Sequence, residues 1–144
     1  MTRVDFYLLK AAGEAPREIF ACRLAEKVYR LEQSVHIHAA NPRQASHLDD
    51  LLWTFRDGSF VPHELVEHGG GPVESPVTIG CSVQALRTAD LLINLSDDRV
   101  DASDAFPRLA EIVTSDEDRK QRSRRLFAEY RSQGHDLETH DIPR

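Results

Sequence analysis

The chain has 144 residues, of which 40% are hydrophobic and 29% charged, as expected for one globular domain spanning residues 1–144. This composition excludes disordered, collagen-like and disulfide-scaffold proteins, and the longest apolar runs are too short to cross a membrane. The first residues lack the apolar segment of a signal peptide, so we expect a soluble cytoplasmic protein. Cys22 and Cys81 have no CxxC partner and are expected to be small buried residues.

The formal net charge of −6 is distributed unevenly along the chain. Residues 89–118 hold 9 acidic and 2 basic side chains, whereas residues 119–144 hold 7 basic and 4 acidic ones. The negative total argues against attraction of the whole surface to nucleic acid or anionic lipid. An acidic segment followed by a basic one predicts a local electrostatic site near the C-terminus.

The first half of the chain alternates strand-like and helix-like segments. β-forming residues predict strands over 4–9 and 35–40, and apolar residues at helical spacing predict a helix over 16–33 and another around 45–55. The apolar stripe of the first helix is Phe20, Leu24, Val28 and Leu31, and that of the second is Ala45, Leu48, Leu52 and Phe55. The order β-α-β-α is typical of right-handed crossovers in a parallel sheet.

The second half begins with a loop over 57–76 that is rich in glycine and proline. Strands are predicted over 77–81 and 90–95, and two helices finish the domain, one from Ser103 to about Val113 and one from Ser115 to Gly134. The predicted fold is therefore α/β, with three layers in which helices cover both faces of a mostly parallel, Rossmann-like sheet.

A sheet of this kind often binds nucleotides, but the glycine patterns that cradle phosphates are missing. The turn over 10–16 has one glycine and no Lys-Ser/Thr pair, and Gly69-Gly70-Gly71 leads into Pro72 instead of a helix. The sequence therefore predicts no nucleotide site and no cofactor.

The sequence also lacks a clear motif for metal binding or for catalysis. His36 and His38 share one strand face and could form a metal triad with His63 or His68, yet there is no HExxH motif and no paired cysteine. We interpret these histidines as structural rather than as zinc ligands. There is no GxSxG motif, and the pair Asp49-Asp50 suits an ordinary polar helix face, so neither a metal nor an enzyme is expected.

An aromatic segment lies between the second helix and the loop. Phe55 falls on the core stripe of its helix, whereas Trp53 lies off that stripe, and Phe60 and Pro62 follow close by. Large aromatic residues beside a loop stiffened by proline can anchor an interface. Packing of the loop onto its own domain explains the same residues equally well.

The C-terminal helix has an unusual face. Lys120, Arg124, Phe127 and Arg131 recur at i, i+4, i+7 and i+11, so three cations surround an aromatic ring. The opposite stripe, with Leu126 and Tyr130, is the predicted buried side. The cationic face fits an acidic peptide with an apolar tip, or less specifically nucleic-acid phosphates; a merely solvated face remains the alternative.

Several segments in order along nearly the whole chain resemble the chi subunit family of bacterial DNA polymerase III holoenzyme. The most specific of them is Trp53 followed by Ser59-Phe60-Val61-Pro62-His63. The others are Asp5-Phe6-Tyr7-Leu8-Leu9, Leu48-Asp49-Asp50-Leu51-Leu52, Glu64-Leu65, Pro76-Val77-Thr78-Ile79, Asp90-Leu91-Leu92-Ile93-Asn94-Leu95 and the segment from Arg124 to Gly134.

This resemblance implies a nucleotide-binding-like fold without nucleotide site or catalysis, acting as a replication adaptor. It implies a heterodimer with the psi subunit, which joins the protein to the clamp loader, and a separate surface for the acidic C-terminal tail of single-stranded-DNA-binding protein. By position, Trp53, Phe60, Pro62 and His63 match the psi contact. The tail site matches Lys120, Arg124 and Phe127, with Arg131 on the same face and Ile112 or Val113 as the apolar wall.

A tail that ends in an apolar residue needs a cation for its carboxylate, an apolar pocket and further cations for upstream acids. The flanking Arg119, Arg125 and Arg131 are expected to speed association. The resemblance also allows a helicase as partner of the aromatic surface. A degenerate nucleotide-dependent or nucleic-acid-processing enzyme of the same fold is the alternative, and tight direct binding of single-stranded DNA is not expected at net charge −6.

Overall fold

The computed structural model describes residues 2–58, 60–66, 75–82, 88–100 and 106–143. These residues form one sheet in the strand order β3-β4-β2-β5-β6-β1-β7, and all six neighbouring pairs are parallel. The strands are β1 (Arg3–Leu8), β2 (Val35–His38), β3 (His63–Leu65), β4 (Val77–Gly80), β5 (Leu91–Asn94), β6 (Arg108–Val113) and β7 (Asp136–Asp141). The helices are α1 (Glu14–Arg30), α2 (Pro42–Thr54) and α3 (Glu117–Ser132).

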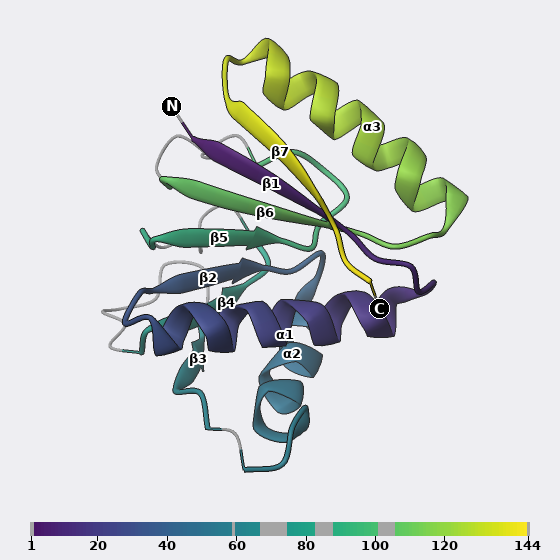
Figure 1. The fold of residues 1–144 in the computed structure, drawn as a ribbon. Coiled ribbons are helices and arrows are strands. Elements are labelled where there is room, and N and C mark those ends of the chain that lie inside the picture. The colour runs from purple at the N-terminus through teal and green to yellow at the C-terminus, as the bar shows by residue number, and fades with distance from the viewer. Residues whose placement is uncertain (1, 59, 67–74, 83–87, 101–105, 144) are drawn as a thin grey trace.

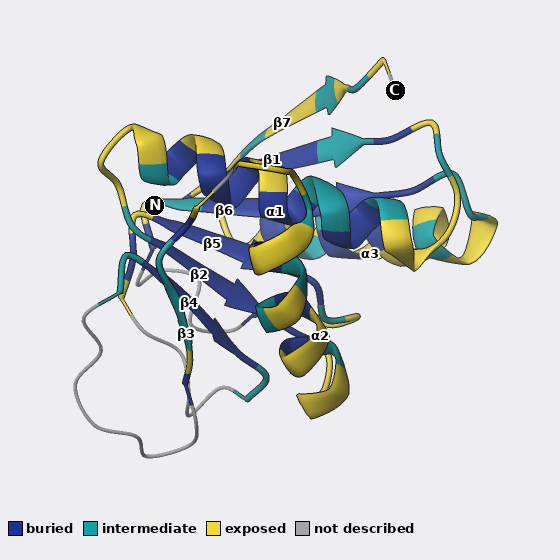
Figure 2. Ribbon diagram, turned by 90° about the horizontal axis from the view of Figure 1, so that it is seen from below, coloured by how far each residue is buried: buried dark blue, intermediate teal, exposed yellow. Residues whose placement is uncertain are grey.

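The three layers predicted from the sequence are confirmed. One core lies between the sheet and the helices α1 and α2, and it joins Ile37 and Ile93 of the sheet to Val28 and Leu48 of the helices. A second core lies on the opposite face, under α3. Figure 1 shows α1 and α2 on one side and α3 beside β7. The middle strands β2, β4 and β5 are buried on both faces, as Figure 2 shows, which explains the continuous apolar run of β5.

Local sequence explains where the helices begin and end. Asn41 precedes α2, and its side-chain oxygen accepts a hydrogen bond of 2.8 Å from the Gln44 N–H, while Pro42 occupies the first helical turn. The predicted buried position of Leu31 is wrong. The α1 helix ends at Arg30, and Leu31 follows with 61% of its surface exposed because Glu32, at φ 60°, turns the chain away.

Three other expectations are wrong. The helix predicted from Ser103 to Val113 is a strand, β6, over residues 108–113, and residues 103–105 lie outside the described part. The loop predicted over 57–76 contains the short strand β3. The helix predicted from Ser115 to Gly134 is confirmed as α3, but it does not finish the domain, since β7 follows α3 and pairs with β1. The apolar residues of β6 also fit a helical spacing. Because both faces of this strand are covered, apolar and polar residues do not alternate along it as they do in a half-exposed strand.

Buried cysteine is confirmed for Cys22, whose thiol pKa is raised to about 12 by burial and by the nearby Glu18 carboxylate. Cys81 is half-buried against the same core. His36 is also fully buried, and its Nδ1 lies 2.6 Å from the Thr78 hydroxyl, which fits the structural role predicted for this histidine.

A polar network crosses the core beneath α3. Glu111 of β6 is buried, and its Oε2 accepts hydrogen bonds from the Tyr130 hydroxyl at 2.8 Å and from the Asn94 side-chain amide at 2.7 Å. Burial raises the pKa of the Glu111 carboxyl to about 7, although both hydrogen bonds oppose that shift. The carboxyl thus holds its proton in the folded protein at pH values where the unfolded chain has lost it.

Stability should therefore fall as pH rises from about 4.5 to about 7. With a pKa of 4.5 in the unfolded chain and about 7 in the folded protein, the protonated carboxyl stabilises fully below pH 4.5 and this contribution is lost by pH 7. The expected loss is up to about 3 kcal/mol. Urea unfolding at a series of pH values measures it.

The variant Glu111→Gln should lose this part of the pH dependence, because an amide does not titrate in that window. Tyr130→Phe should extend it to higher pH, since removing the hydroxyl takes away a hydrogen bond that favours the charged carboxylate. An unchanged pH slope in Glu111→Gln would contradict the assignment.

Candidate functional site

The order of the connections places a crevice at the carboxyl ends of the neighbouring strands β6 and β1. The chain leaves β1 through α1 on one face of the sheet and leaves β6 through α3 on the other. In open α/β sheets, ligands bind outside the carboxyl ends of strands at such a reversal. A pocket of about 480 Å³ opens beside this crevice, between α3 and the sheet.

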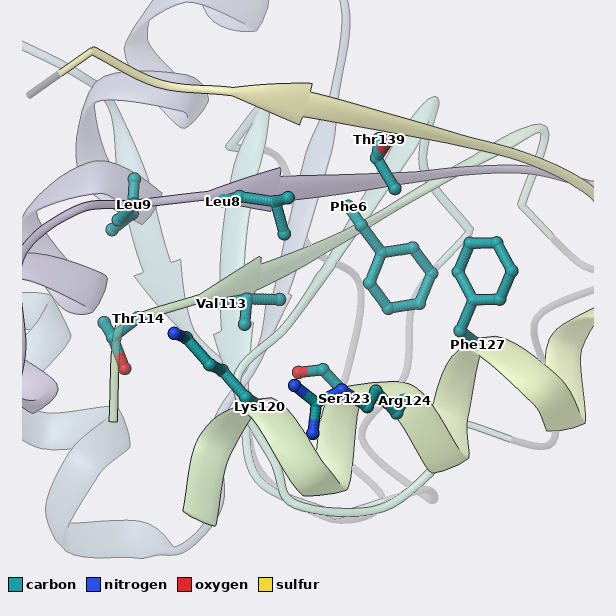
Figure 3. A pocket seen from close by; sticks show the side chains of 10 residues that line it. All are labelled: Phe6, Leu8, Leu9, Val113, Thr114, Lys120, Ser123, Arg124, Phe127 and Thr139. Atoms are coloured by element: carbon teal, nitrogen blue, oxygen red, sulfur yellow. The ribbon is translucent and has the colours of Figure 1, made fainter. Parts of the chain in front are cut away.

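The pocket is apolar inside and cationic at its mouth (Figure 3). Its apolar lining is Phe6, Leu8, Leu9, Val113 and Phe127, and its polar lining is Thr114, Lys120, Ser123, Arg124 and Thr139. The rings of Phe6 and Phe127 face each other with centroids 5.3 Å apart, at an angle of 51°. An apolar group can enter between sheet and helix while its charged end stays near the helix cations.

Lys120 and Arg124 lie one helical turn apart on α3, and both are exposed. Arg124 has an exposed ionic neighbour, Glu117, with Nη1 to Oε1 at 3.7 Å. Within the described part of the chain, Lys120 has no ion-pair partner within 4 Å. Two solvated cations beside an apolar cavity can bind a carboxylate that carries an apolar group.

Three of the four predicted residues of the cationic face meet at this pocket: Lys120, Arg124 and Phe127. Arg131 is exposed one turn beyond Phe127 and does not line the pocket. Of the two residues suggested for the apolar wall, Val113 lines the pocket, whereas Ile112 points into the core on the other face.

The buried stripe predicted for the helix is confirmed, because Leu126 and Tyr130 are at most 2% exposed. The expectation for Arg119 is wrong: its side chain is 12% exposed and pairs with Asp97 at 3.2 Å and Glu14 at 3.6 Å. Because its charge is already neutralised, Arg119 ties α3 to neighbouring loops rather than steering a partner.

Sequence reasoning missed the part of the pocket that the sheet contributes. Phe6, Leu8 and Thr139 come from β1 and β7. A period of two along β1 puts Phe6 and Leu8 on one face, and this signal was present in the sequence. The sequence did not show that α3 covers this face of β1, because that assignment depends on β7, which brings Thr139 to the same edge of the sheet.

The turn after β1, where nucleotide-binding proteins of this fold hold phosphate, is occupied by the protein's own carboxylate. The Gly13 N–H donates to Asp116 Oδ2 at 2.9 Å, and the Thr114 hydroxyl donates to the same oxygen at 2.7 Å. These two bonds hold the pKa of the Asp116 carboxyl below its ordinary value. An anion supplied by the chain thus already satisfies the amide that a phosphate would use.

Arg17 fills the neighbouring carboxyl ends of β5 and β6. Its side chain is 1% exposed, and it donates to the Ile112 carbonyl at 2.9 Å and to the Leu95 carbonyl at 3.1 Å. A third contact joins it to Glu14 Oε2 at 2.8 Å. Burial lowers the pKa of the Arg17 guanidinium, the neighbouring Glu14 opposing that shift. The guanidinium connects α1 to both strands.

The predicted aromatic residues gather at the opposite edge of the sheet. Trp53 is 54% exposed and Phe60 is 63% exposed, and their ring centroids are 5.7 Å apart. The His63 ring lies 4.8 Å from Trp53, and its two nitrogens contact the backbone carbonyls of Val61 and Asp49. Trp53, Phe60, Pro62 and His63 form what we term the aromatic surface. Packing within the domain holds His63 but leaves Trp53 and Phe60 open.

One cluster in the described part of the chain has the ligand types of a metal site. Ligand atoms of Asp5, Glu138 and His140 lie within 4.8 Å of one another. Two guanidinium groups already face these carboxylates, since Arg3 lies 3.1 Å from Asp5 and Arg108 lies 3.6 Å from it. Balanced charge makes this cluster an ion-pair network that joins β7 to β1 and β6.

Fold and pocket together define a doubly wound α/β protein whose ligand site suits an anionic group with an apolar part. The sequence profile of the family described as DNA polymerase III chi subunit, HolC, matches residues 1–138. The chain belongs to this family, whose members are named as subunits of DNA polymerase III.

Curated relatives agree over their full lengths. The chain is 41% identical to the DNA polymerase III subunit chi of Pseudomonas aeruginosa, covering 100% of this chain and 99% of that protein. It is 31% identical to the subunits chi of Haemophilus influenzae and of Escherichia coli, covering 96% of this chain and 96% and 97% of those proteins. Among the described residues, no helix has both the length and the apolar character needed to span a membrane.

Proposed function

We propose that this chi subunit is a non-catalytic adaptor with two protein-binding surfaces. The pocket beside α3 binds the acidic C-terminal tail of single-stranded-DNA-binding protein. The aromatic surface binds the psi subunit and so joins the protein to the clamp loader in the cytoplasm. The observation that carries the proposal is the apolar pocket with Lys120 and Arg124 at its mouth.

The pocket supports a peptide terminus better than a nucleic-acid backbone. A terminal carboxylate can pair with Lys120 or Arg124 while the last side chain enters the apolar pocket that Phe6 and Phe127 help to line. A DNA backbone would instead require a row of cations without an apolar cavity, and the net charge of −6 opposes it.

The aromatic surface supports a second protein partner. Trp53 and Phe60 present two large rings to solvent, and Leu65 on the edge strand β3 is 44% exposed next along the chain. Exposed aromatic residues of this kind dominate the energy of protein interfaces. Because β3 and the pocket lie near opposite edges of the sheet, both partners can bind at the same time.

The absence of catalysis is supported by the turn that an enzyme of this fold would use for phosphate. The Gly13 N–H already donates a hydrogen bond to the Asp116 carboxylate, and Glu14 adds another negative charge at the start of α1. A nucleotide phosphate would meet two carboxylates at this turn. The alternative, a nucleotide-dependent enzyme, requires nucleotide binding at this turn, and the two negative charges oppose such binding.

The tail assignment is tested by Arg124→Ala. Loss of this guanidinium should weaken binding of a synthetic tail peptide by about 1–3 kcal/mol, the scale of a charge-assisted hydrogen bond. Isothermal titration of the full chain with the peptide measures the effect. Arg125→Ala is the matched control, since Arg125 is an exposed neighbour that does not line the pocket.

Circular dichroism should show that both variants are folded. Equal affinity of Arg124→Ala and the unchanged protein for the peptide would refute the assignment. A peptide with an amidated C-terminus should also bind more weakly than the free acid, because the carboxylate no longer pairs with a cation.

A further inference from the structure

The cationic face of α3 carries an acidic residue at its start. Glu117, Lys120, Arg124, Phe127 and Arg131 follow at i, i+3, i+7, i+10 and i+14, so all five lie on one stripe of the helix. Glu117 Oε1 lies 3.7 Å from Arg124 Nη1, two helical turns away along the chain. An internal carboxylate is thus placed beside the cation that faces the mouth of the pocket.

We propose that Glu117 is a built-in competitor that lowers the affinity of the pocket for carboxylate ligands. This inference rests on the function proposed above. In the unbound protein, the Glu117 carboxylate stands in for the carboxylate of a ligand at Arg124. A peptide carboxylate must displace Glu117 before it can pair with Arg124.

The chemistry of the pair suits a reversible competitor. Glu117 and Arg124 are 67% and 68% exposed, so their ion pair is weak and gives way to a ligand that also fills the apolar pocket. A small carboxylate without an apolar part gains only the ionic contact and must still displace Glu117. Because every carboxylate must displace Glu117, the competitor weakens simple carboxylates and tail peptides by the same factor, and a ligand that also fills the apolar pocket has binding energy left to overcome it.

The experiment compares tail-peptide affinities of the full chain and its Glu117→Gln variant by titration at low salt. Removing the competitor should raise the affinity about two- to fivefold, the range expected for one exposed ion pair. The gain should shrink in high salt, which screens exposed charges. Acetate, as a simple carboxylate probe, should also bind Glu117→Gln more tightly than the unchanged protein, by a similar factor.

Asp118→Asn is the matched control, because it removes the same charge from the same helical turn but lies on the face of Arg122 and Arg125. An equal gain in this control would overturn the proposal in favour of a general charge effect. In an Arg124→Gln background, the additional change Glu117→Gln should give no gain. A gain that persists there would also overturn it.

The outcome separates this inference from the proposed function. If the unchanged protein binds the peptide and Arg124→Ala weakens it, but Glu117→Gln has no effect, the competitor is refuted and the tail site stands. If the unchanged protein does not bind the peptide, the tail site itself is refuted. Similar urea unfolding midpoints for Glu117→Gln and Asp118→Asn would show that both lose the same helix-end stabilisation.

Discussion

Replacing Arg17 by alanine should lower the free energy of unfolding by about 3–5 kcal/mol, as expected when one partner of a buried ionic network is removed. The change leaves the Ile112 and Leu95 carbonyls without their guanidinium donor and opens a cavity where the side chain was fully buried. Urea denaturation followed by circular dichroism measures the loss.

Arg23→Ala provides the control, since Arg23 is exposed on the same helix and its loss should cost well under 1 kcal/mol. Arg17→Lys keeps the charge but not the forked geometry that reaches two carbonyls, and it should fall between the two. Arg17→Ala unfolding within 1 kcal/mol of the unchanged protein would contradict the structural role given to the guanidinium.

Replacing Trp53 by alanine should abolish or strongly weaken psi binding, with an expected loss of about 2–4 kcal/mol for a central aromatic anchor. Trp53 is more than half exposed and contacts Phe60 and His63, so its loss removes the middle of the aromatic surface without opening the core. Copurification of the subunits and titration with psi measure the effect. Affinity for the tail peptide should stay unchanged.

Leu31→Ala is a suitable control, because Leu31 is a similarly exposed apolar residue outside the aromatic surface. It should bind both partners normally. Loss of psi and of the tail peptide together in Trp53→Ala would point to unfolding, and full retention of psi binding would place the psi contact elsewhere.

The sequence predicted the fold class well and the ends of the chain less well. In the first 95 residues the sequence predicts six of the seven strands and helices, all but β3, because helices with one apolar face and fully buried strands have different patterns. The β6 strand was misread as helix since Leu109, Ile112 and Val113 also fit a helical stripe. The edge strand β7, Asp-Leu-Glu-Thr-His-Asp, is polar and mostly exposed, so hydrophobicity gave no signal for it.

The candidate site divides in the same way. A helical period of 3.6 was enough to group Lys120, Arg124 and Phe127, because these residues belong to one element. The opposing wall comes from β1 and β7, whose paired residues are 133 apart in sequence, and nothing local indicates that these strands meet. The sequence could likewise suggest that Trp53 and Phe60 belong to an interface. It could not show that their rings are in contact, because their placement depends on the unpredicted strand β3.

The parallel sheet also fixes a distance. Five inter-strand spacings separate β3, beside the aromatic surface, from β1, which lines the pocket. At about 4.8 Å for each spacing, they amount to about 24 Å of continuous hydrogen-bonded sheet. The two partners of an adaptor built this way are held apart by a stiff spacer instead of a flexible tether. A force applied to one partner would be transmitted to the other through the hydrogen-bonded sheet with little extension.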